Sequence, residues 1–167
     1  MSNRLDSMEA KEAGKANVVK TRLDGLVGVF KTLVQQHSSV SALLRRMQDR
    51  PEKKAELWPE IRRELLSHER GEMRAVYPVL REHALLRGLA GHHAQEASEI
   101  ERLIGEIDAA QPEAGRRLID QLVDAVRRHI EMEEKEIFPK AQKAIGEQGA
   151  RELDAKFFAA KKSATTV

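Results

Sequence analysis

The fold is decided by a stretch that occurs twice, HERGEMRAVYP at residues 68–78 and HIEMEEKEIFP at residues 129–139. Each copy reads His-x-x-x-Glu, followed after four residues by an aromatic residue and a proline. A histidine and a carboxylate four residues apart lie about 40° apart around an α-helix, so both side chains point the same way. Both pairs interrupt an apolar stripe, and polar groups on a buried helix face must be paired or bound to a metal. Two such pairs on two helices therefore indicate a shared site.

The composition is typical of a helical domain. Of the 167 residues, 34% are charged and 4% are aromatic, and there is no cysteine. The formal net charge of +2 gives no reason to expect nucleic-acid binding, and the lack of cysteine excludes disulfides and zinc–thiolate sites. No apolar run approaches membrane-spanning length, and the N-terminus lacks the apolar core of a signal peptide. We therefore expect a cytoplasmic protein with neither a membrane nor a nucleic-acid partner.

Apolar periodicity predicts four long helices and one short helix. They are expected at about residues 19–47, 58–78, 89–107, 113–145 and 151–160. Short connections favour an all-α fold, an antiparallel up-and-down four-helix bundle, over residues 17–147. Residues 1–16 are polar and are expected to form a disordered arm. Residues 148–167 are expected to form a short helix, packed through Leu153, Phe157 and Phe158, and a basic tail.

The first and third helices each add a histidine to the buried side. His37 continues an apolar stripe whose steps are all three or four residues. His92 and His93 are adjacent, and helical phase places His93 within about 30° of the centre of the apolar face and His92 about 70° away. Residues that face each other across a helical hairpin lie about equally far from its turn. By this test His37, His68, His93 and His129 lie at one height in the bundle.

Four inward histidines at one height favour a metal site. A lone histidine on an apolar face is usually a structural residue, but four in register on four helices are not expected by coincidence. The candidate ligands are His37, His68, Glu72, His93, Glu96, His129 and Glu133. His83 has no partner at a suitable spacing and is expected to be structural. Tyr77 and Phe138 are expected to project away from the preceding histidines and to brace the helix ends.

The set of candidate ligands restricts the metal in part. Imidazoles and carboxylates without thiolate suit iron, manganese or zinc. One metal needs three or four ligands, so this larger set favours two metals bridged by Glu72 and Glu133. The alternative is a metal-free interaction bundle in which the histidines are structural.

The pattern resembles that of the hemerythrin family, in particular the bacterial HHE cation-binding domains, over about residues 23–145. The resemblance rests on His37, on the two repeated stretches and on His93. It implies a non-haem centre of two iron ions, favoured over zinc or manganese, that binds dioxygen or a related small oxidant. It also implies that the four histidines are terminal ligands and that Glu72 and Glu133 are bridges.

One position departs from the oxygen-carrying proteins that the chain resembles. Those proteins have a further histidine one turn before the third-helix ligand, where this chain has Leu89. The departure leaves His92, Glu96, Glu69 or water to complete the coordination. It favours binding or sensing of an oxidant over reversible oxygen carriage. The alternative is an enzyme of nitric oxide or peroxide detoxification or of iron-centre repair, and an electron-donor protein would be a partner in such chemistry.

Overall fold

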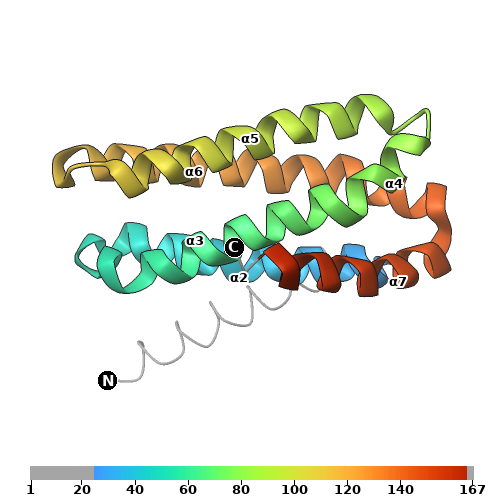
Figure 1. Ribbon diagram of the computed structural model, residues 1–167, viewed down its shortest axis with the longest axis horizontal. Helices are drawn as coiled ribbons and strands as arrows, with labels where there is room; N and C mark the ends of the chain where they lie inside the picture. Colours follow the sequence, from blue (N-terminus) through green and yellow to red (C-terminus); the bar gives the residue numbers. More distant parts are fainter. Residues whose placement is uncertain (1–24, 165–167) are drawn as a thin grey trace, which may run out of the picture.

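The computed structural model describes residues 25–164, apart from the side chains of residues 112 and 113. Its described residues contain helices and no strand, and four helical rods pack as a bundle (Figure 1). In chain order the elements are α2 (Gly28–Asp49), the 3-10 turn η1 (Pro51–Lys53), α3 (Lys54–Gly71), the π-helical turn η2 (Glu72–Val76), α4 (Tyr77–Glu82), α5 (Arg87–Ala109), α6 (Pro112–Met132), the π-helical turn η3 (Glu133–Ile137) and α7 (Phe138–Ala164). The predicted four-helix bundle is confirmed. The predicted arm, residues 1–16, lies outside the described residues.

Apolar side chains fill the bundle in two layers, and a polar layer lies between them. The first apolar layer includes Val40, Leu44, Ile61, Ile104 and Leu122. The second includes Phe30, Val34, Leu80, Ile137 and Phe138. Along α2, His37 follows Val34 of the second layer and precedes Val40 of the first. The histidines of the polar layer are His37, His68, His93 and His129, each at most 6% exposed. The bundle therefore holds four buried histidines, as predicted.

Two helices begin at other residues than the periodicity predicted. α2 begins at Gly28, and the positive φ angles of 81° at Gly25 and 53° at Gly28 are not α-helical. The earlier part of the predicted helix, residues 19–24, lies outside the described residues. A Cβ at Gly28 would come within 2.3 Å of the Ala150 backbone, so glycine also permits the close approach of α7 there. α3 begins at Lys54, directly after η1, and Pro59 lies inside it. Neither difference moves a candidate ligand out of its helix.

The C-terminal helix is longer than predicted. α7 breaks at Gly146, whose φ of 75° and ψ of 168° are accessible to glycine, and the chain then returns along α2 and α3 (Figure 1). Leu153 and Phe157 are buried, as predicted, whereas Phe158 is half exposed. The helix continues to Ala164 through residues that were expected to begin the basic tail. Across the described residues, no helix combines the length and the apolar character needed to cross a membrane.

Candidate metal centre

Each repeated stretch passes from an α-helix into one π-helical turn at its glutamate. The Tyr77 N–H donates to the Glu72 carbonyl in η2, and the Phe138 N–H donates to the Glu133 carbonyl in η3, five residues back in both cases. The next residue is a proline in both copies, which has no N–H to donate and whose ring clashes with the carbonyl four residues back in an α-helix. Widening the turn by one residue moves that carbonyl away from the ring. Such turns frequently occur at functional sites.

The wider turns bring both aromatic residues to the site. One extra residue rotates the following helix by about 100°, whereas a regular helix would place Tyr77 opposite His68. The Tyr77 hydroxyl donates to Glu133 Oε1 at 2.6 Å, and its ring stacks on His93 with 3.5 Å between centroids. Phe138 stacks on His37 with 5.8 Å between centroids. The sequence predicted that the two aromatic residues project away from the preceding histidines, His68 and His129, and brace the helix ends. Their rings instead lie on the histidines of other helices, a contact that the sequence did not predict.

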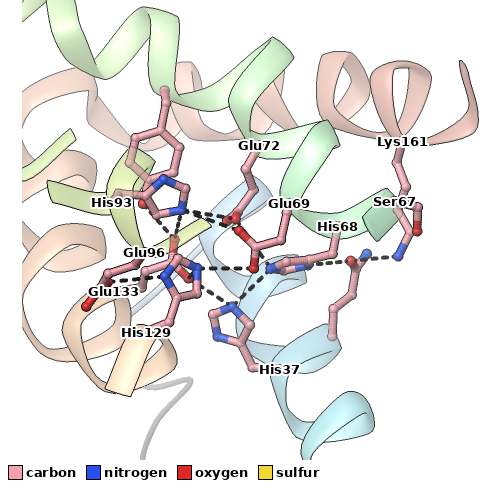
Figure 2. Close-up of polar contacts among 12 residues, drawn as sticks. His37, Ser67, His68, Glu69, Glu72, His93, Glu96, His129, Glu133 and Lys161 are labelled. Carbon is pink, nitrogen blue, oxygen red and sulfur yellow. Dashed lines mark hydrogen bonds and ion pairs between the residues drawn. The ribbon is translucent and has the colours of Figure 1, made fainter. Parts of the chain in front are cut away.

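A first group of four side chains converges from four elements. Its members are His37 from α2, His68 from α3, Glu72 from η2 and Glu133 from η3, with one ligand atom of each within 4.8 Å of the others. His37 Nε2 lies 3.2 Å from His68 Nε2 and 3.0 Å from Glu133 Oε2. His68 Nε2 lies 3.4 Å from Glu72 Oε2. Figure 2 shows the rings and carboxylates pointing toward one another.

A second group lies beside the first and shares a carboxylate with it. Its members are Glu69, Glu72, His93 and His129. His129 Nε2 lies 3.2 Å from Glu69 Oε1, and His93 Nε2 lies 3.5 Å from Glu72 Oε2. Glu133 also reaches this group, because its Oε1 lies 2.9 Å from His93 Nε2. Two groups that share carboxylates are consistent with a binuclear metal site.

Most of the candidate ligands predicted from the sequence lie in these two groups, and Glu96 does not. Glu96 Oε2 instead lies 3.2 Å from His129 Nδ1, the nitrogen that faces away from the second group. Glu69, which the sequence raised only as an alternative for completing the coordination, lies inside that group. His93 is fully buried, whereas the side chain of His92 is 49% exposed, so the helical phase predicted for these two residues is confirmed.

Three of the histidines have an acceptor on their outer nitrogen. The Nδ1 pairs are His37 with Glu134 Oε1 at 2.9 Å, His68 with Gln36 Oε1 at 3.0 Å, and His129 with Glu96 Oε2 at 3.2 Å. Each acceptor favours a proton on Nδ1 and leaves Nε2 to face the interior. Partners of this kind orient histidines that bind metals and fix their tautomer.

Many buried polar atoms of the site have no hydrogen-bond partner. Both oxygens of Glu72 and both ring nitrogens of His93 lack one, as do Glu69 Oε2, His129 Nε2 and Glu133 Oε2. His93 Nε2 and Glu133 Oε1 are close enough for an ion pair but are not aligned for a hydrogen bond. An unsatisfied buried polar group costs about 1–3 kcal/mol, and here these groups gather at one place. Metal ions between them would remove that cost, so the residues fit a binuclear site.

Protons are unevenly distributed in the first group when no metal is bound. Burial alone would lower the pKa of His37, but contacts with Glu133 and Glu134 outweigh it and raise the pKa to about 9. Burial and the charge of His37 lower the pKa of His68 to about 3. His37 therefore carries a proton at neutral pH, and His68 accepts a hydrogen bond from it.

Both histidines of the second group, His93 and His129, carry a proton at neutral pH when no metal is bound. Burial disfavours charge on His93, but its contacts with Glu133 and Glu72 raise its pKa to about 9. Burial likewise opposes charge on His129, yet Glu69 and Glu133 raise its pKa well above the usual value. Burial and the charge of Glu133 raise the pKa of Glu72 to about 7. Bound protons thus supply the positive charge among these carboxylates in the metal-free protein.

Comparison with known proteins supports this interpretation of the site. The model of the hemerythrin HHE cation-binding domain matches residues 28–141, which contain every member of both groups. Searches among curated proteins and among solved structures gave no match. The matched span covers most of the chain, from the start of α2 to the first turn of α7. The chain therefore belongs to the hemerythrin HHE cation-binding domain family.

Proposed function

We propose that this protein binds two iron ions between its helices and uses them to bind or sense dioxygen or a related small oxidant. The observation that carries the proposal is the sharing of Glu72 by two buried groups, with Glu133 in contact with both. Imidazole and carboxylate ligands without thiolate suit iron, and bridging carboxylates hold paired metals in helical bundles. Iron is the metal that the family resemblance favours over zinc or manganese.

The two metal positions would have unequal sets of ligands. His37 and His68 would hold one ion, and His93, His129 and Glu69 would hold the other, with Glu72 and Glu133 between them. The first position therefore has one terminal ligand fewer. This difference supports the first position as the one with room for a small molecule.

The chain's own residues would orient and shield the bound iron pair. The iron pair would supply electrons to a bound oxidant. The Tyr77 hydroxyl donates to Glu133 Oε1 and so fixes the orientation of that carboxylate. Apolar side chains above and below the polar layer, among them Val34 and Val40, exclude water from it.

Glu69 supports a second candidate function. Glu69 gives the second group a carboxylate as a terminal ligand. An imidazole in its place would make the ligand set richer in nitrogen. Carboxylates stabilise the more highly charged ferric state, so this ligand set favours net redox reaction with an oxidant over its reversible carriage. Detoxification of peroxide or nitric oxide, or repair of iron centres, would be such a reaction, with an electron-donor protein as partner.

Iron loading tests the proposal directly. Protein loaded with ferrous iron without oxygen, desalted and assayed for metal should contain about two iron ions per chain. Admission of air should then produce a charge-transfer absorption band. The variant His93→Ala should lose iron, whereas the matched control His92→Ala should keep it, because only His93 is buried in the site. Saturation at one ion, with no spectral change in air, would contradict a di-iron centre.

A further inference from the structure

The C-terminal half of α7 packs against the outer side of His68, although it lies beyond residues 28–141 of the family match. The Phe157 ring meets the His68 ring edge-on, with 6.1 Å between centroids, and Phe157 is fully buried. A Cβ at Gly71 would come within 2.9 Å of Phe157 Cε2 and 3.3 Å of Lys161 Cβ. The missing side chain at Gly71 lets this segment lie close to α3 and places Lys161 beside the site.

Lys161 reaches His68 through a single side chain, Gln36. The His68 Nδ1 lies 3.0 Å from Gln36 Oε1, and Lys161 Nζ donates to the same oxygen at 2.9 Å. Lys161 Nζ also donates to Glu64 Oε2 at 3.0 Å, which holds the ammonium at this place. Figure 2 shows this chain of contacts extending from Lys161 toward the centre of the site.

Among the outer acceptors, Gln36 is the one that is neutral. His37 and His129 face the carboxylates of Glu134 and Glu96, which accept a hydrogen bond at either oxygen. An amide has one accepting end and one donating end, so it orients a histidine only if its oxygen is turned the right way. An ammonium cannot bond to the amide NH₂, and Lys161 therefore selects the orientation in which the oxygen of Gln36 faces His68.

The surroundings of Gln36 make such selection necessary. A cavity of about 240 Å³ lies on this face of the bundle, and Gln36, Glu64, His68 and Lys161 are among the residues that line it. Water that enters a cavity of this size can compete for the amide oxygen. Without Lys161 the amide would be free to present its NH₂ group to the ring.

We propose that Lys161 is a positioning residue for the metal site: through the amide oxygen of Gln36 it holds His68 in the tautomer with the proton on Nδ1 and with Nε2 free to bind metal. The metal part of this inference rests on the proposed function, since it concerns the ion held by His37 and His68. The tautomer part concerns the metal-free protein and stands separately. The C-terminal half of α7, which follows the residues matched by the family, thus becomes part of the site.

The tautomer of His68 is the first measurement. In ¹⁵N-labelled metal-free protein at neutral pH, long-range ¹H–¹⁵N spectra should show His68 protonated on Nδ1. His37 Nε2 faces His68 Nε2 and favours the same tautomer, so the Lys161 variants are made in a His37→Phe background. There Lys161→Met should lose this single tautomer, whereas Lys161→Arg should keep it. Lys156→Met, which removes an exposed lysine from the same helical segment, is the matched control and should resemble the wild type. Retention of the Nδ1 tautomer in Lys161→Met would overturn the proposal.

A compensating variant separates positioning from packing. Gln36→Glu replaces the amide by a carboxylate, as at the outer nitrogens of His37 and His129, and makes the lysine unnecessary. The double variant Gln36→Glu/Lys161→Met should therefore recover the Nδ1 tautomer that Lys161→Met loses. If Lys161 acts only by packing, the double variant will stay as altered as the single one, and the proposal is wrong.

Zinc titration measures the consequence for the metal site. Loss of an outer partner typically weakens metal binding about 10–100-fold, so in Lys161→Met one of two zinc ions should bind that much more weakly and the other should not change. Unchanged affinity for both ions would overturn the metal part of the inference. Failure of the wild type to bind two ions would instead contradict the proposed function, and the tautomer measurement would still decide the role of Lys161.

Discussion

The two copies of the repeated stretch have the same backbone but different surroundings. In both, a histidine and a glutamate four residues apart lead into a π-helical turn, an aromatic residue and a proline. His68 and His129 are both buried, and Glu72 and Glu133 are both fully buried. The copies face each other across the bundle, so each glutamate contacts both groups of side chains.

Two of the differences between the copies remove or add a buried polar group. Glu69 follows His68 and contacts His129, whereas Ile130 follows His129 and packs in the first apolar layer. Tyr77 donates to Glu133, whereas Phe138 has no hydroxyl and stacks on His37. The histidine, the glutamate and the π-helical turn that the two copies share thus form the common part of the site. The positions that differ make the two sides of the site unequal. Substitutions that remove the shared part should have larger effects than those that exchange the differing part.

The largest effect should follow from changing the shared carboxylates. Metal at about a thousand times its dissociation constant stabilises the fold by about 4 kcal/mol, or about 8–16 °C in melting temperature for a chain of this size. Glu72→Gln or Glu133→Gln should erase most of that difference, because a neutral amide bridges two metals poorly. Melting curves with and without iron measure it.

The control for this experiment is His83→Ala, since His83 lies between α4 and α5, outside both groups. It should leave the metal-dependent stabilisation intact. The metal-free wild type should remain helical, because continuous apolar layers lie on both sides of the site. Equal melting temperatures for the metal-free and metal-loaded wild type would contradict a metal site at the centre of the bundle.

A smaller effect should follow from replacing Glu69 of the first copy by isoleucine, the residue at the matching position, Ile130, of the second copy. Glu69→Ile removes a terminal carboxylate from the second group and leaves the first group complete. Zinc stoichiometry, measured by elemental analysis after gel filtration, should fall from about two ions per chain toward about one. Glu96→Gln is the comparison, since Glu96 contacts the outer nitrogen of His129 and the exposed His92 but belongs to neither group, so its loss should weaken binding without removing an ion. A stoichiometry of two in Glu69→Ile would remove Glu69 from the set of ligands.

Sequence patterns predicted the bundle and the height of the four histidines, because helical phase gives the buried face of each helix and the distance to each turn gives the height. The shared role of the glutamates was predicted from the size of the ligand set. It did not find Glu69 as a main candidate, since a residue next to His68 is about 100° away on the helix. A signal was present in the sequence: alignment of the two copies puts Glu69 at the position of Ile130, where a buried apolar residue stands. A carboxylate at such a position indicates a partner in the interior.

Tyr77 and the C-terminal half of α7 were harder to predict. The phase that placed Tyr77 away from the site assumes a regular α-helix, and one π-helical turn cancels it. The proline directly after the aromatic residue, within an expected helix, was the available warning. The return of α7 onto α3 depends on Gly146 and on the space left at Gly71, and such tertiary contacts have no periodic signature.

The two metal positions should also differ in the protons they release. Histidines must be neutral to bind metal, so affinity rises with pH up to the pKa of the metal-free histidine. At pH 7 the first position must displace a proton from His37, with a pKa of about 9, but none from His68, with a pKa of about 3. The second must displace protons from His93, with a pKa of about 9, and from His129, whose pKa is raised further.

At pH 7 we therefore expect zinc binding to release about three histidine protons per chain in the wild type and about one from the first position alone. The shared Glu72, with a pKa of about 7, adds about half a proton to each count. Calorimetry in buffers of different ionisation enthalpy counts these protons, and the Glu69→Ile variant isolates the first position. Below about pH 9, each additional proton released adds a further tenfold increase in metal affinity per pH unit. Equal proton counts for the two positions would show that His68 and His129 have similar pKa values.

The smallest effect should follow from exchanging the aromatic residues. Tyr77→Phe makes the first copy like the second and removes the hydrogen bond to Glu133 Oε1, while the ring can still stack on His93. A hydrogen bond to a charged group contributes about 2 kcal/mol, so the metal-free protein should melt about 4–8 °C lower. The metal-loaded form should lose less, because a bridging carboxylate is held by its metals, and metal content should not change. The reverse exchange, Phe138→Tyr, places a hydroxyl near His37 and should not restore the loss, since Glu133 Oε1 is approached by Tyr77. If Tyr77→Phe instead emptied the site of metal, the Tyr77 hydroxyl would be essential for metal binding. The difference between Tyr77 and Phe138 would then determine whether the site forms and not only its asymmetry.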